Sequence, residues 1–458
     1  MPASSSFLAG DALAIWKAGI AAVDSASLVR EQIIAGPDFL EIAGVRWTSR
    51  EEGRICVVGA GKAGTGMARG LEEALGSPWL ARTTGWMNVP ADCLQPLQKI
   101  HLHAARPAGL NEPTTEGVVG TREILSRVHQ LRPQDLCIVL ISGGGSALLP
   151  APVAGISLAD KQRVTRTLMS CGATIAELNC VRRSLSKIKG GGLARACRAG
   201  QIITLIISDV IGDPLDVIAS GPTVPSPASF SEALNVLRHF ERRKGVSFPS
   251  SVWDVLERRS EIQPASSPAL PQLTNVVIGN NETAVTAAAR CAGKLGYQVR
   301  GEEWDREGEA ASSGAEFAER MLSEQRKPFS DHSLPGFCLI SGGETTVDLT
   351  STSDPGKGGR NQEFALAAAI TWLKNRASQV ALVSGGTDGE DGPTDAAGAC
   401  VNDAVLEQIH NSGISPEEAL LRHASYDFFA RVEGLLHTGP TQTNVMDLRV
   451  GLGRCDTP

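Results

Sequence analysis

Short apolar runs alternate with amphipathic segments along the first half of the chain. Three of these runs have the length of buried strands, and two are apolar at almost every position. The predicted strands cover residues 54–58, 135–141 and 201–207. Apolar residues at helical spacing predict helices over residues 63–75, 114–131 and 157–171, with a further helical stretch around Asn179. Such alternation is typical of a parallel sheet with helices on both faces.

The apolar rhythm fades between residues 245 and 271, where proline and serine accumulate. We interpret this stretch as a linker that contains one short helix, over residues 253–259. The second half resumes with predicted strands over 275–278, 297–299, 336–340 and 379–383, an exposed strand over 345–349, and helices over 361–373 and from the turn at 279–281 to Lys294.

At 458 residues the chain exceeds one ordinary hydrophobic core. We therefore predict an α/β protein of two domains. The predicted parts are a Rossmann-like N-terminal domain with a parallel sheet flanked by helices (1–245), a linker (246–271) and a C-terminal α/β domain (272–458).

Composition excludes some classes of partner. A net charge of −7 gives no basic footprint for a polyanion, and an aromatic content of 4% argues against base-stacking platforms. The ten cysteines form no CxxC pair, so we expect reduced thiols and neither disulfides nor a zinc site. No apolar run is long enough to span a bilayer. We expect a cytoplasmic protein that binds small molecules and neither nucleic acid nor membrane, and a homodimer stays open as its assembly.

Three glycine-rich loops each follow a predicted strand. They are Gly59-Ala-Gly61-Lys62-Ala-Gly64, Ser142-Gly143-Gly144-Gly145-Ser146 and Ser341-Gly342-Gly343-Glu344. Glycine allows a backbone to approach an anion closely, and a helix that follows directs its N–H groups at that anion. Because ligands bind at the carboxyl ends of parallel strands, these loops predict a protein that holds phosphates from several sides.

The first loop has the letters of a dinucleotide fingerprint, but that signature also needs an acidic residue at the end of the next strand. Residues 83–88 contain no carboxylate, so the sequence supports a nicotinamide site only weakly. Lys62 inside the turn instead suits the neutralisation of a phosphate or carboxylate, with Gly61 beside the anion. The alternative is a lysine that is simply exposed on a tight turn.

The second loop offers successive N–H groups and two hydroxyls, which favours an anion site over a plain sharp turn. Its candidate phosphate-binding residues are Ser142, Gly143, Gly144, Gly145 and Ser146. Lys189 adjoins a further glycine run and is the basic residue that we add to them. Arg182 and Arg183 are equally well explained as a solvated basic face.

Two aspartates, Asp209 and Asp213, follow the buried strand at 201–207. A carboxylate at the end of such a strand is placed to bind Mg²⁺ or to accept a hydroxyl proton. We assign Asp209 to the reacting hydroxyl and Asp213 to the metal. Helix capping is a strong alternative for Asp213.

In the second half, Arg360 stands at the start of a predicted helix, where its planar guanidinium lies beside free N–H groups and favours phosphate binding. The loop at 385–395 then packs three aspartates into eight positions, without the spacing of an EF-hand. This pattern predicts a Mg²⁺–phosphate assembly. The candidate metal ligands are Glu344, Asp388 and Asp391, and the candidate phosphate-binding residues are Asn361 and Thr394.

The chain has neither a P-loop motif nor the protein-kinase signature set. Taken together, its motifs resemble those of the class II glycerate kinases, or glycerate 2-kinases, whose C-terminal half is called MOFRL (here about 335–450). The most specific segments are VVGAGKAG, LISGGGSALLPAP, LNCVRRSLSKIKGG, ISDVIGDPLDVIASGPT, SGGETTV, GKGGRNQEFALA, GTDGEDGPTDAAGA and TGPTQTNVMDLR. They extend over nearly the whole chain and occur in the family's order.

The resemblance implies phosphorylation of D-glycerate at its 2-hydroxyl, with ATP and Mg²⁺, in a cleft between two α/β domains. The family's lysine, aspartate and arginine fall on Lys62, Asp209 and Arg360. Lys62 would neutralise substrate or phosphoryl charge, Asp209 would orient or deprotonate the hydroxyl, and Arg360 would stabilise the moving phosphoryl group.

The chain departs from the family pattern at two places. A glycine–histidine loop is replaced by Met87-Asn-Val-Pro90, and a later His-Pro pair is replaced by Arg106-Pro107. Two alternatives to the kinase stay open: a hydroxypyruvate reductase, which needs a nicotinamide site, and a non-catalytic sensor of sugar phosphates, for which the surplus of aspartates has no use.

Overall fold

The computed structural model describes residues 5–48, 53–110, 112–226, 229–261, 270–327, 335–350, 352 and 354–454. These residues form two compact units. We call the unit of residues Ser25–Ile278 the N unit. The other, which we call the C unit, combines the residues up to Asp24 with those from Gly279 onward.

The N unit contains a six-stranded sheet in the order β6-β5-β4-β7-β8-β9. Its strands are β4 (Ile55–Ala60), β5 (Thr83–Pro90), β6 (Ile100–Arg106), β7 (Leu136–Ile141), β8 (Gln201–Ile207) and β9 (Gln272–Gly279). The pairs from β6 through β8 are parallel, and every residue of β4, β7 and β8 is buried. The predicted parallel sheet is therefore confirmed, and its continuous apolar strands are buried on both faces because helices cover both.

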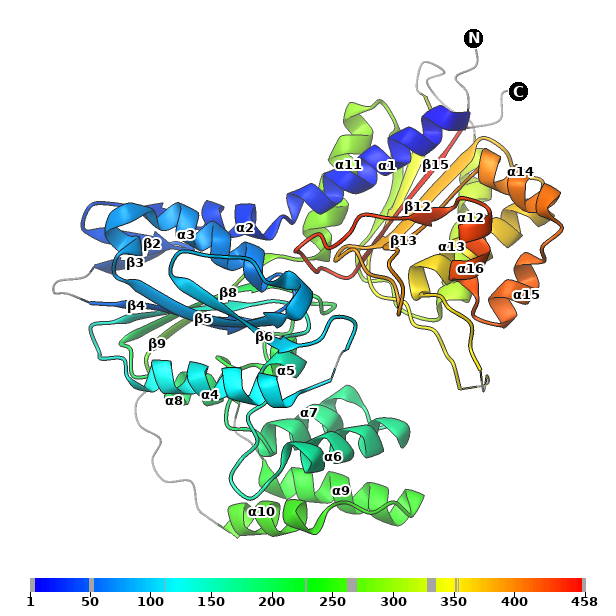
Figure 1. Cartoon of the computed structure of the whole chain (residues 1–458). Coiled ribbons are helices and arrows are strands. Elements are labelled where there is room, and N and C mark those ends of the chain that lie inside the picture. Colours follow the sequence, from blue (N-terminus) through cyan, green and yellow to red (C-terminus); the bar gives the residue numbers. More distant parts are fainter. Residues whose placement is uncertain are drawn as a thin grey trace. The chain divides into compact units, whose positions relative to one another are not determined.

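Helices lie on the two faces of this sheet (Figure 1). One face carries α2 (Ser25–Glu31) and α3 (Gly64–Leu80), beside a small antiparallel sheet of β1 (Ile33–Ala35), β2 (Phe39–Ile42) and β3 (Val45–Thr48). The other face packs against α4 (Thr115–His129), α5 (Gly145–Leu148) and α8 (Gly192–Ala196), which contribute Ile124, Leu148 and Leu193 to a shared core.

Four further helices of the N unit form a core of their own. They are α6 (Leu158–Ser170), α7 (Ile175–Ser184), α9 (Phe230–Lys244) and α10 (Ser250–Glu261). Leu168, Val181, Leu237 and Val252 meet in that core. Helix α10 falls inside the predicted linker and is an integral part of this helical group, whereas residues 262–269 of that stretch lie outside the described residues.

The C unit contains a mixed six-stranded sheet in the order β10-β11-β15-β12-β13-β14. Its strands are β10 (Gln298–Glu303), β11 (Phe337–Ser341), β12 (Val380–Gly386), β13 (Gly398–Asn402), β14 (Leu435–Leu436) and β15 (Asp447–Gly453). Strand β15 runs antiparallel between β11 and β12. The sequence did not predict β15, yet β15 determines which side chains reach the carboxyl ends of its two neighbours.

Helices cover both faces of the C-unit sheet as well. The first group is α1 (Ser5–Ala22) and α11 (Asn281–Lys294), which pack on Cys338 and Ile340 of β11. The second group, α12 (Ala310–Gln325), α13 (Arg360–Lys374), α14 (Asp403–Ser412) and α16 (Ser425–Arg431), packs on the opposite face with Leu339, and α15 (Pro416–Leu421) lies beside α13. Successive residues of β11 thus enter different cores, as the two-residue period of a strand requires.

The first helix belongs to the C unit, although the sequence-based division placed it in the N-terminal domain. Ala12, Ile15 and Trp16 of α1 are buried against the C-unit sheet, and the Trp16 ring nitrogen donates to the Leu448 carbonyl at 2.9 Å. Amphipathic spacing predicts such a helix but carries no information on which sheet it covers. The predicted cleft between the domains stays a prediction.

Among the described residues, no single helix is both long and apolar enough to cross a membrane; one bent pair, Phe7–Ala22 with Ser25–Glu31, passes on length and composition alone. The predicted exposed strand at 345–349 was wrong, because this stretch makes a single bridge, from Thr346 to Glu309. The nine cysteines that the structure describes are free thiols, and Cys455 lies outside the described residues.

Candidate functional site

The first two glycine loops lie side by side at the carboxyl ends of β4 and β7. Lys62 N–H donates to the Gly143 carbonyl at 2.9 Å, and Ala63 N–H donates to Ser142 Oγ at 3.0 Å. Glycine is required at Gly61, where φ is 149° and a Cβ would lie 2.0 Å from Ser142 Oγ. The two loops therefore pack tightly against each other and are hydrogen-bonded together at the ends of two adjacent strands.

Several loop N–H groups that the sequence assigned to phosphates are used inside the protein. Gly61 N–H donates to the Asn88 carbonyl at 3.3 Å, and Gly343 N–H of the third loop donates to Asn281 Oδ1 at 3.1 Å. No helix follows the third loop within residues 342–350. The N–H groups of Gly61 and Gly343 are therefore engaged within the protein and not directed at a ligand.

Two basic side chains flank Gly144 in the second loop. A Cβ on this glycine would lie 3.4 Å from a terminal guanidinium nitrogen of Arg106 and 3.7 Å from Cγ of Lys62. Lys62 is half-buried and Arg106 is buried. Arg106, which the sequence singled out only as a departure from the family pattern, thus contributes positive charge beside the lysine predicted to be catalytic.

Lys189 is buried and joins the second loop to the segment before Gly221. Its ammonium donates to Ser146 Oγ at 2.7 Å, to the Ser146 carbonyl at 3.1 Å and to Ser220 Oγ at 3.2 Å. The hydroxyls of Ser146 and Ser220 are 3.1 Å apart. Lys189 and Ser146, which the sequence proposed separately, therefore meet in one polar cluster.

The backbone beside Lys189 is strained. Ala219, Ser220 and Gly221 have φ values of 51°, 63° and 59°, all in the left-handed region that side chains other than glycine seldom adopt. Ala219 and Ser220 each store strain on the order of 1–3 kcal/mol, whereas Gly221 adopts this region freely. Strained residues of this kind cluster at functional sites. This strain supports a functional role for the cluster of Ser146, Lys189 and Ser220.

Arg182 also belongs to this cluster, so the interpretation of Arg182 as part of a solvated face was wrong. Its guanidinium donates to Ser146 Oγ, and burial lowers its pKa below the usual range. The neighbouring Arg183 instead pairs with the half-exposed Asp216 at 3.2 Å. The side chains of these two adjacent residues of α7 therefore have different partners, which the sequence alone does not reveal.

The two predicted acids of the N unit follow β8. Asp209 and Asp213 are both half-buried, and Asp213 has a left-handed φ of 53° in a turn closed by its N–H and the Val210 carbonyl at 3.1 Å. Helix capping does not explain Asp213, since no helix begins there among the described residues. Both acids keep the position after a buried strand that motivated their selection.

In the C unit, Arg360 is the first residue of α13 and is held by two carboxylates. Its Nε lies 2.9 Å from Asp447 Oδ2, its terminal nitrogens lie 3.0 Å from Asp447 Oδ1 and 2.6 Å from Glu344 Oε1. Burial lowers the pKa of Arg360, but Asp447 and Glu344 outweigh that effect and raise it above the usual range. About a third of the side chain remains exposed, so the oriented guanidinium can still reach a ligand.

Asp447 was missed by the sequence analysis and is central to this arrangement. It is fully buried at the start of β15 and also accepts from Arg449 at 2.8 Å and from Asn361 at 2.8 Å. Arg449 is fully buried and donates to the Gly342 carbonyl at 3.0 Å. The sequence did contain a sign of this pairing, because Asp447 and Arg449 are two residues apart and therefore lie on one face of a strand.

The predicted metal ligand Asp391 has a structural role at the start of α13. Its carboxylate accepts from the N–H groups of Asn361 and Gln362 at 3.0 and 2.9 Å, and burial raises its pKa to about 7. Thr394 donates to the Asp391 carbonyl at 2.8 Å and fixes the same loop. Asn361 and Thr394, which the sequence assigned to phosphate, therefore both hydrogen-bond to Asp391.

The remaining metal candidates, Glu344 and Asp388, are half-buried. Glu344 pairs with Arg360, and Asp388 accepts from the Glu390 N–H at 3.1 Å. Within the described part of the chain, no three acids, histidines or cysteines come together as a metal cage. The structure thus offers single carboxylates, which suits a metal that arrives with phosphate ligands of its own.

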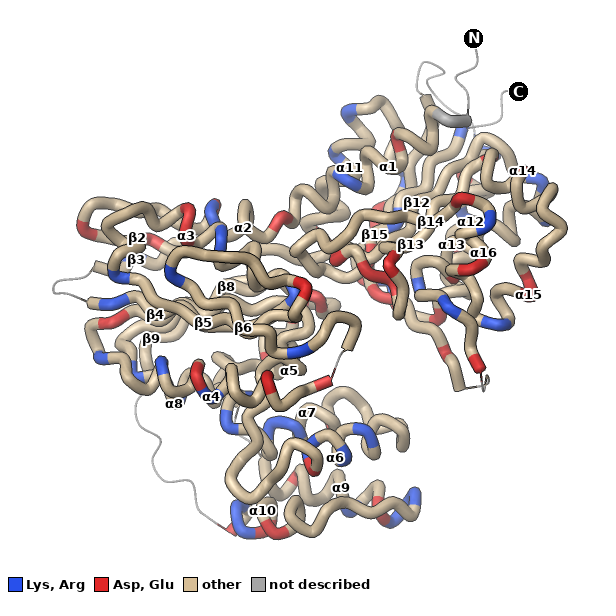
Figure 2. Tube along the Cα trace, viewed as in Figure 1, with Lys and Arg blue, Asp and Glu red and all other residues tan. Residues whose placement is uncertain are grey.

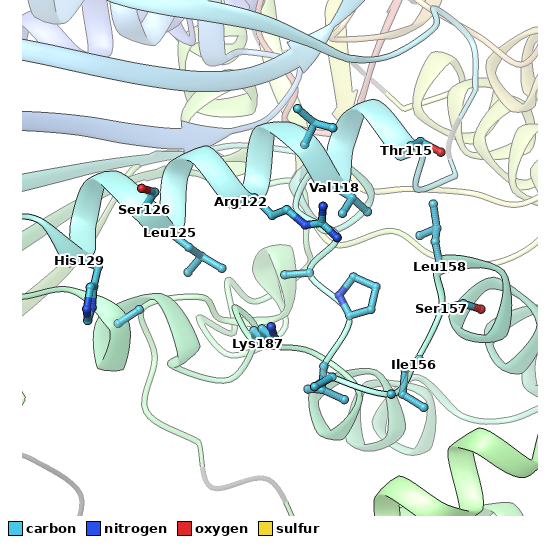
Figure 3. A pocket seen from close by; sticks show the side chains of 17 residues that line it. Thr115, Val118, Arg122, Leu125, Ser126, His129, Ile156, Ser157, Leu158 and Lys187 are labelled. Carbon is cyan, nitrogen blue, oxygen red and sulfur yellow. The ribbon is translucent and has the colours of Figure 1, made fainter.

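A separate cavity of about 810 Å³ lies in the N unit between α4 and the loop at residues 151–158. None of the predicted site residues lines it. Figure 3 shows Arg122 on α4 extending over the cavity, with Lys187 across from it and His129 at one end. This cavity is therefore distinct in its lining residues from the clusters around Lys189 and Arg360.

The sequence matches two family models in order along the chain. Residues 11–257 match the DUF4147 domain, described as a domain of unknown function, and residues 337–447 match the MOFRL family. A glycerate kinase of Rattus norvegicus is 36% identical over 97% of this chain and 92% of its own length. A glycerate 2-kinase of Pyrococcus horikoshii is 37% identical over 88% of each chain.

Two solved structures share the fold. A glycerate kinase from Thermotoga maritima superimposes with a TM-score of 0.80 at 33% identity, over 98% of this chain and all of the other. A protein from Pyrococcus horikoshii OT3 gives a TM-score of 0.77 at 34% identity, over all of both chains. Because both family models match and these relatives, at 36% and 37% identity, cover 97% and 88% of it, the chain belongs to the DUF4147–MOFRL family of glycerate kinases.

Proposed function

We propose that this protein phosphorylates D-glycerate on its 2-hydroxyl with ATP and releases 2-phosphoglycerate and ADP. The observation that carries the proposal is the pairing of Arg360 with Asp447 and Glu344 at the first turn of α13, since it presents an oriented guanidinium beside a helix N-terminus. Such a group suits a transferring phosphoryl group. The similarity to glycerate kinase of Rattus norvegicus supports the same activity, and the similarity to glycerate 2-kinase of Pyrococcus horikoshii supports the 2-position.

In the proposed reaction the 2-hydroxyl oxygen of D-glycerate attacks the γ-phosphorus of ATP. The bond from that phosphorus to the bridging oxygen breaks, ADP leaves, and the hydroxyl proton passes to Asp209. Lys62 neutralises negative charge on the substrate or phosphoryl group, with Arg106 adding positive charge beside it. Arg360 stabilises the phosphoryl oxygens, because catalysis of this kind consists mainly of positioning and electrostatic stabilisation.

Mg²⁺ would neutralise the ATP phosphates when bound. Of the predicted ligands, Asp213, Glu344 and Asp388 are half-buried and would be accessible to such an ion, whereas Asp391 is buried and caps α13. One or two carboxylates are a usual protein contribution to such a metal, and the phosphates and water supply the other ligands. We further propose that the protein acts in the cytoplasm.

The reductase alternative gains no support. Strand β5 ends at Pro90 with Asn88 buried, and Asn88 Nδ2 donates to the Leu148 carbonyl at 2.8 Å. A nicotinamide site would need a carboxylate there for the ribose. The sensor alternative leaves the charged pair of Asp447 with Arg360 without a use.

The test is incubation of the purified protein with ATP, Mg²⁺ and D-glycerate, with the product analysed by ³¹P NMR. We expect a phosphomonoester whose phosphorus couples to the single proton on carbon 2; coupling to the two protons of carbon 3 would contradict the 2-position. A parallel assay follows NADH and NADPH oxidation with hydroxypyruvate. Activity only in the parallel assay would replace the kinase by the reductase.

A further inference from the structure

Three basic residues of the N unit lie near enough to interact electrostatically: Lys161 on α6, Arg182 on α7 and Lys189 after α7. The side chains of Lys161 and Lys189 belong to residues only 4% and 2% exposed. Figure 2 shows basic positions along α6 and α7. Lys161 was not selected in the sequence analysis. It differs from the other two basic residues because its buried amine has no hydrogen-bond acceptor among the described residues.

The charged neighbours of this cluster are positive. Burial lowers the pKa of Lys161, and the positive charge of Arg182 lowers it further. Burial likewise lowers the pKa of Lys189, and Arg182 and Lys161 add to that effect. On α6 itself, Asp160 is engaged by Ser157 at the helix start and by Ser251, and Arg163 is exposed. The groups that shift the pKa values of Lys161 and Lys189 among the described residues are thus cations and not carboxylates.

The amine of Lys161 is the least satisfied polar group of this cluster. It is buried and has no hydrogen-bond partner among the residues that the structure describes. A buried charge without a partner is strongly unfavourable, and it either loses its proton or acquires a counter-ion. Burial, together with the positive charge of Arg182, lowers the pKa of Lys161 to about 7.

We propose that Lys161, Arg182 and Lys189, with the hydroxyls of Ser146 and Ser220, form a binding subsite for a small oxyanion. The ligand is the carboxylate of the hydroxy acid or a phosphoryl group of the nucleotide. The hydroxyls of Ser146 and Ser220 lie 3.1 Å apart, and the Arg182 guanidinium and the Lys189 ammonium both donate to Ser146 Oγ. The amine of Lys161 has no hydrogen-bond partner among the described residues, so it is the group that a ligand would engage. The strained segment 219–221 holds one of these hydroxyls in place.

The subsite makes Lys161 a proton-coupled ligand. In the absence of an anion at pH 8 the amine is mostly neutral, and a bound oxyanion favours its ammonium form. Binding therefore takes up to about one proton from solution, a consequence that a lysine with a purely structural role does not share. The choice of D-glycerate and ATP as probes depends on the proposed function, but the presence of an oxyanion site does not.

The experiment is isothermal titration calorimetry on the full-length protein at pH 8, in two buffers of different ionisation enthalpy. D-glycerate, ATP and inorganic phosphate are the probes, and glycerol is the neutral control. We expect proton uptake in the wild type and loss of that uptake in Lys161→Met. Lys161→Met and Arg182→Gln should each weaken oxyanion binding by about 10- to 100-fold, as expected for losing one charged hydrogen bond. Arg163→Met and Arg183→Gln are the matched controls and should bind as the wild type does.

The probes distinguish the two sources of the anion. Weakening confined to D-glycerate assigns the subsite to the carboxylate, and weakening of ATP and phosphate assigns it to the phosphoryl group. Unchanged affinity and unchanged proton uptake for all three probes in Lys161→Met would overturn the proposal. If Arg182→Gln does not fold, Lys161→Met carries the test, with Arg163→Met as its control.

This result is separable from the outcome for the proposed function. A protein that does not phosphorylate D-glycerate but binds phosphate with Lys161-dependent proton uptake retains the oxyanion subsite and loses the kinase assignment. A protein that turns over D-glycerate while Lys161→Met and Arg182→Gln match their controls retains the kinase assignment and loses the subsite.

Discussion

The two units handle buried positive charge in opposite ways. In the C unit, Arg360 and Arg449 are paired with Asp447, so that cations and an acid balance each other within the protein. In the N unit, Lys161 and Lys189 are buried, and the charged groups that shift their pKa values among the described residues are cations. Lys189 donates to the Ser146 hydroxyl. The C unit thus fixes the orientation of a guanidinium in advance, while the N unit keeps a surplus of positive charge for a ligand to neutralise.

The largest expected effect follows from removing the oriented guanidinium. Arg360→Ala should lower kcat by at least ~10³-fold, the range found when an arginine that stabilises a transferring phosphoryl group is lost. Lys62→Ala should abolish turnover for the corresponding reason in the N unit. Steady-state kinetics with D-glycerate and ATP measure both effects, and circular dichroism shows whether the variants remain folded.

Lys374→Ala is the control, because Lys374 is exposed on the same helix and pairs only with the exposed Glu417 at 3.6 Å. It should keep the wild-type kcat. Full activity in Arg360→Ala or in Lys62→Ala would remove that residue from the mechanism. A loss of activity in Lys374→Ala equal to that in Arg360→Ala would point to a general defect of α13.

The next effect concerns the balance of charge in the C unit. Asp447→Asn should destabilise the protein by about 3–5 kcal/mol, because it leaves Arg449 buried without its counter-charge. Urea unfolding followed by tryptophan fluorescence measures the loss. Asp395→Asn is the control, since Asp395 is exposed and accepts from the Tyr426 hydroxyl at the surface; it should change stability by about 0.5 kcal/mol or less. Equal effects in both variants would contradict a balanced core around Asp447.

Much of the N-unit sheet follows directly from its sequence. Strand β8 has the bounds that the apolar run at 201–207 predicted, since a strand buried on both faces cannot alternate with polar residues. Lys62, Asp209 and Arg360 were selected as candidates because glycine turns and the ends of buried strands are positions where side chains commonly approach ligands. These signals are local, and each of them can be read within about ten residues.

Features that depend on distant segments were not predictable in this way. The role of Asp447 depends on β15 inserting between β11 and β12, and neither neighbour is close to it in sequence. Lys161 did leave a local signal that went unread, because it stands at helical spacing with Val164 and Leu168 on the buried stripe of α6. A lysine on such a stripe predicts a buried amine, but its cationic neighbours come from α7 and the loop beyond.

The pH dependence of stability can sharpen the contrast between the units. In the unfolded chain Lys161 has an ordinary pKa near 10.5, and in the native state about 7, so the unfolded state binds more protons between these values. Stability should therefore rise with pH, by about 2 kcal/mol from pH 7 to 9 for this residue alone. Urea unfolding in buffers free of phosphate and sulfate measures this slope.

Lys161→Met should remove this contribution and be more stable than the wild type at pH 7, because a buried ammonium is replaced by an apolar side chain of similar length. Arg163→Met, which changes an exposed residue of the same helix, should retain the slope. An identical slope in Lys161→Met and the wild type would show that the amine keeps its proton in the native protein.

The smallest effect separates two serines of one glycine loop. Ser142 Oγ accepts from Ala63 N–H at 3.0 Å where the loops after β4 and β7 pack together, whereas Ser146 Oγ contacts Arg182 and Lys189. Ser142→Ala leaves a buried N–H without its acceptor and should cost about 1–3 kcal/mol of stability, measured by urea unfolding. Ser146→Ala removes a hydroxyl that two cations share, so its main effect should fall on oxyanion affinity, measured by calorimetry with D-glycerate and phosphate. If Ser146→Ala lost stability alone and bound both probes normally, the surplus charge of the N unit would be a feature of folding, and the contrast between the units would carry no meaning for ligand binding.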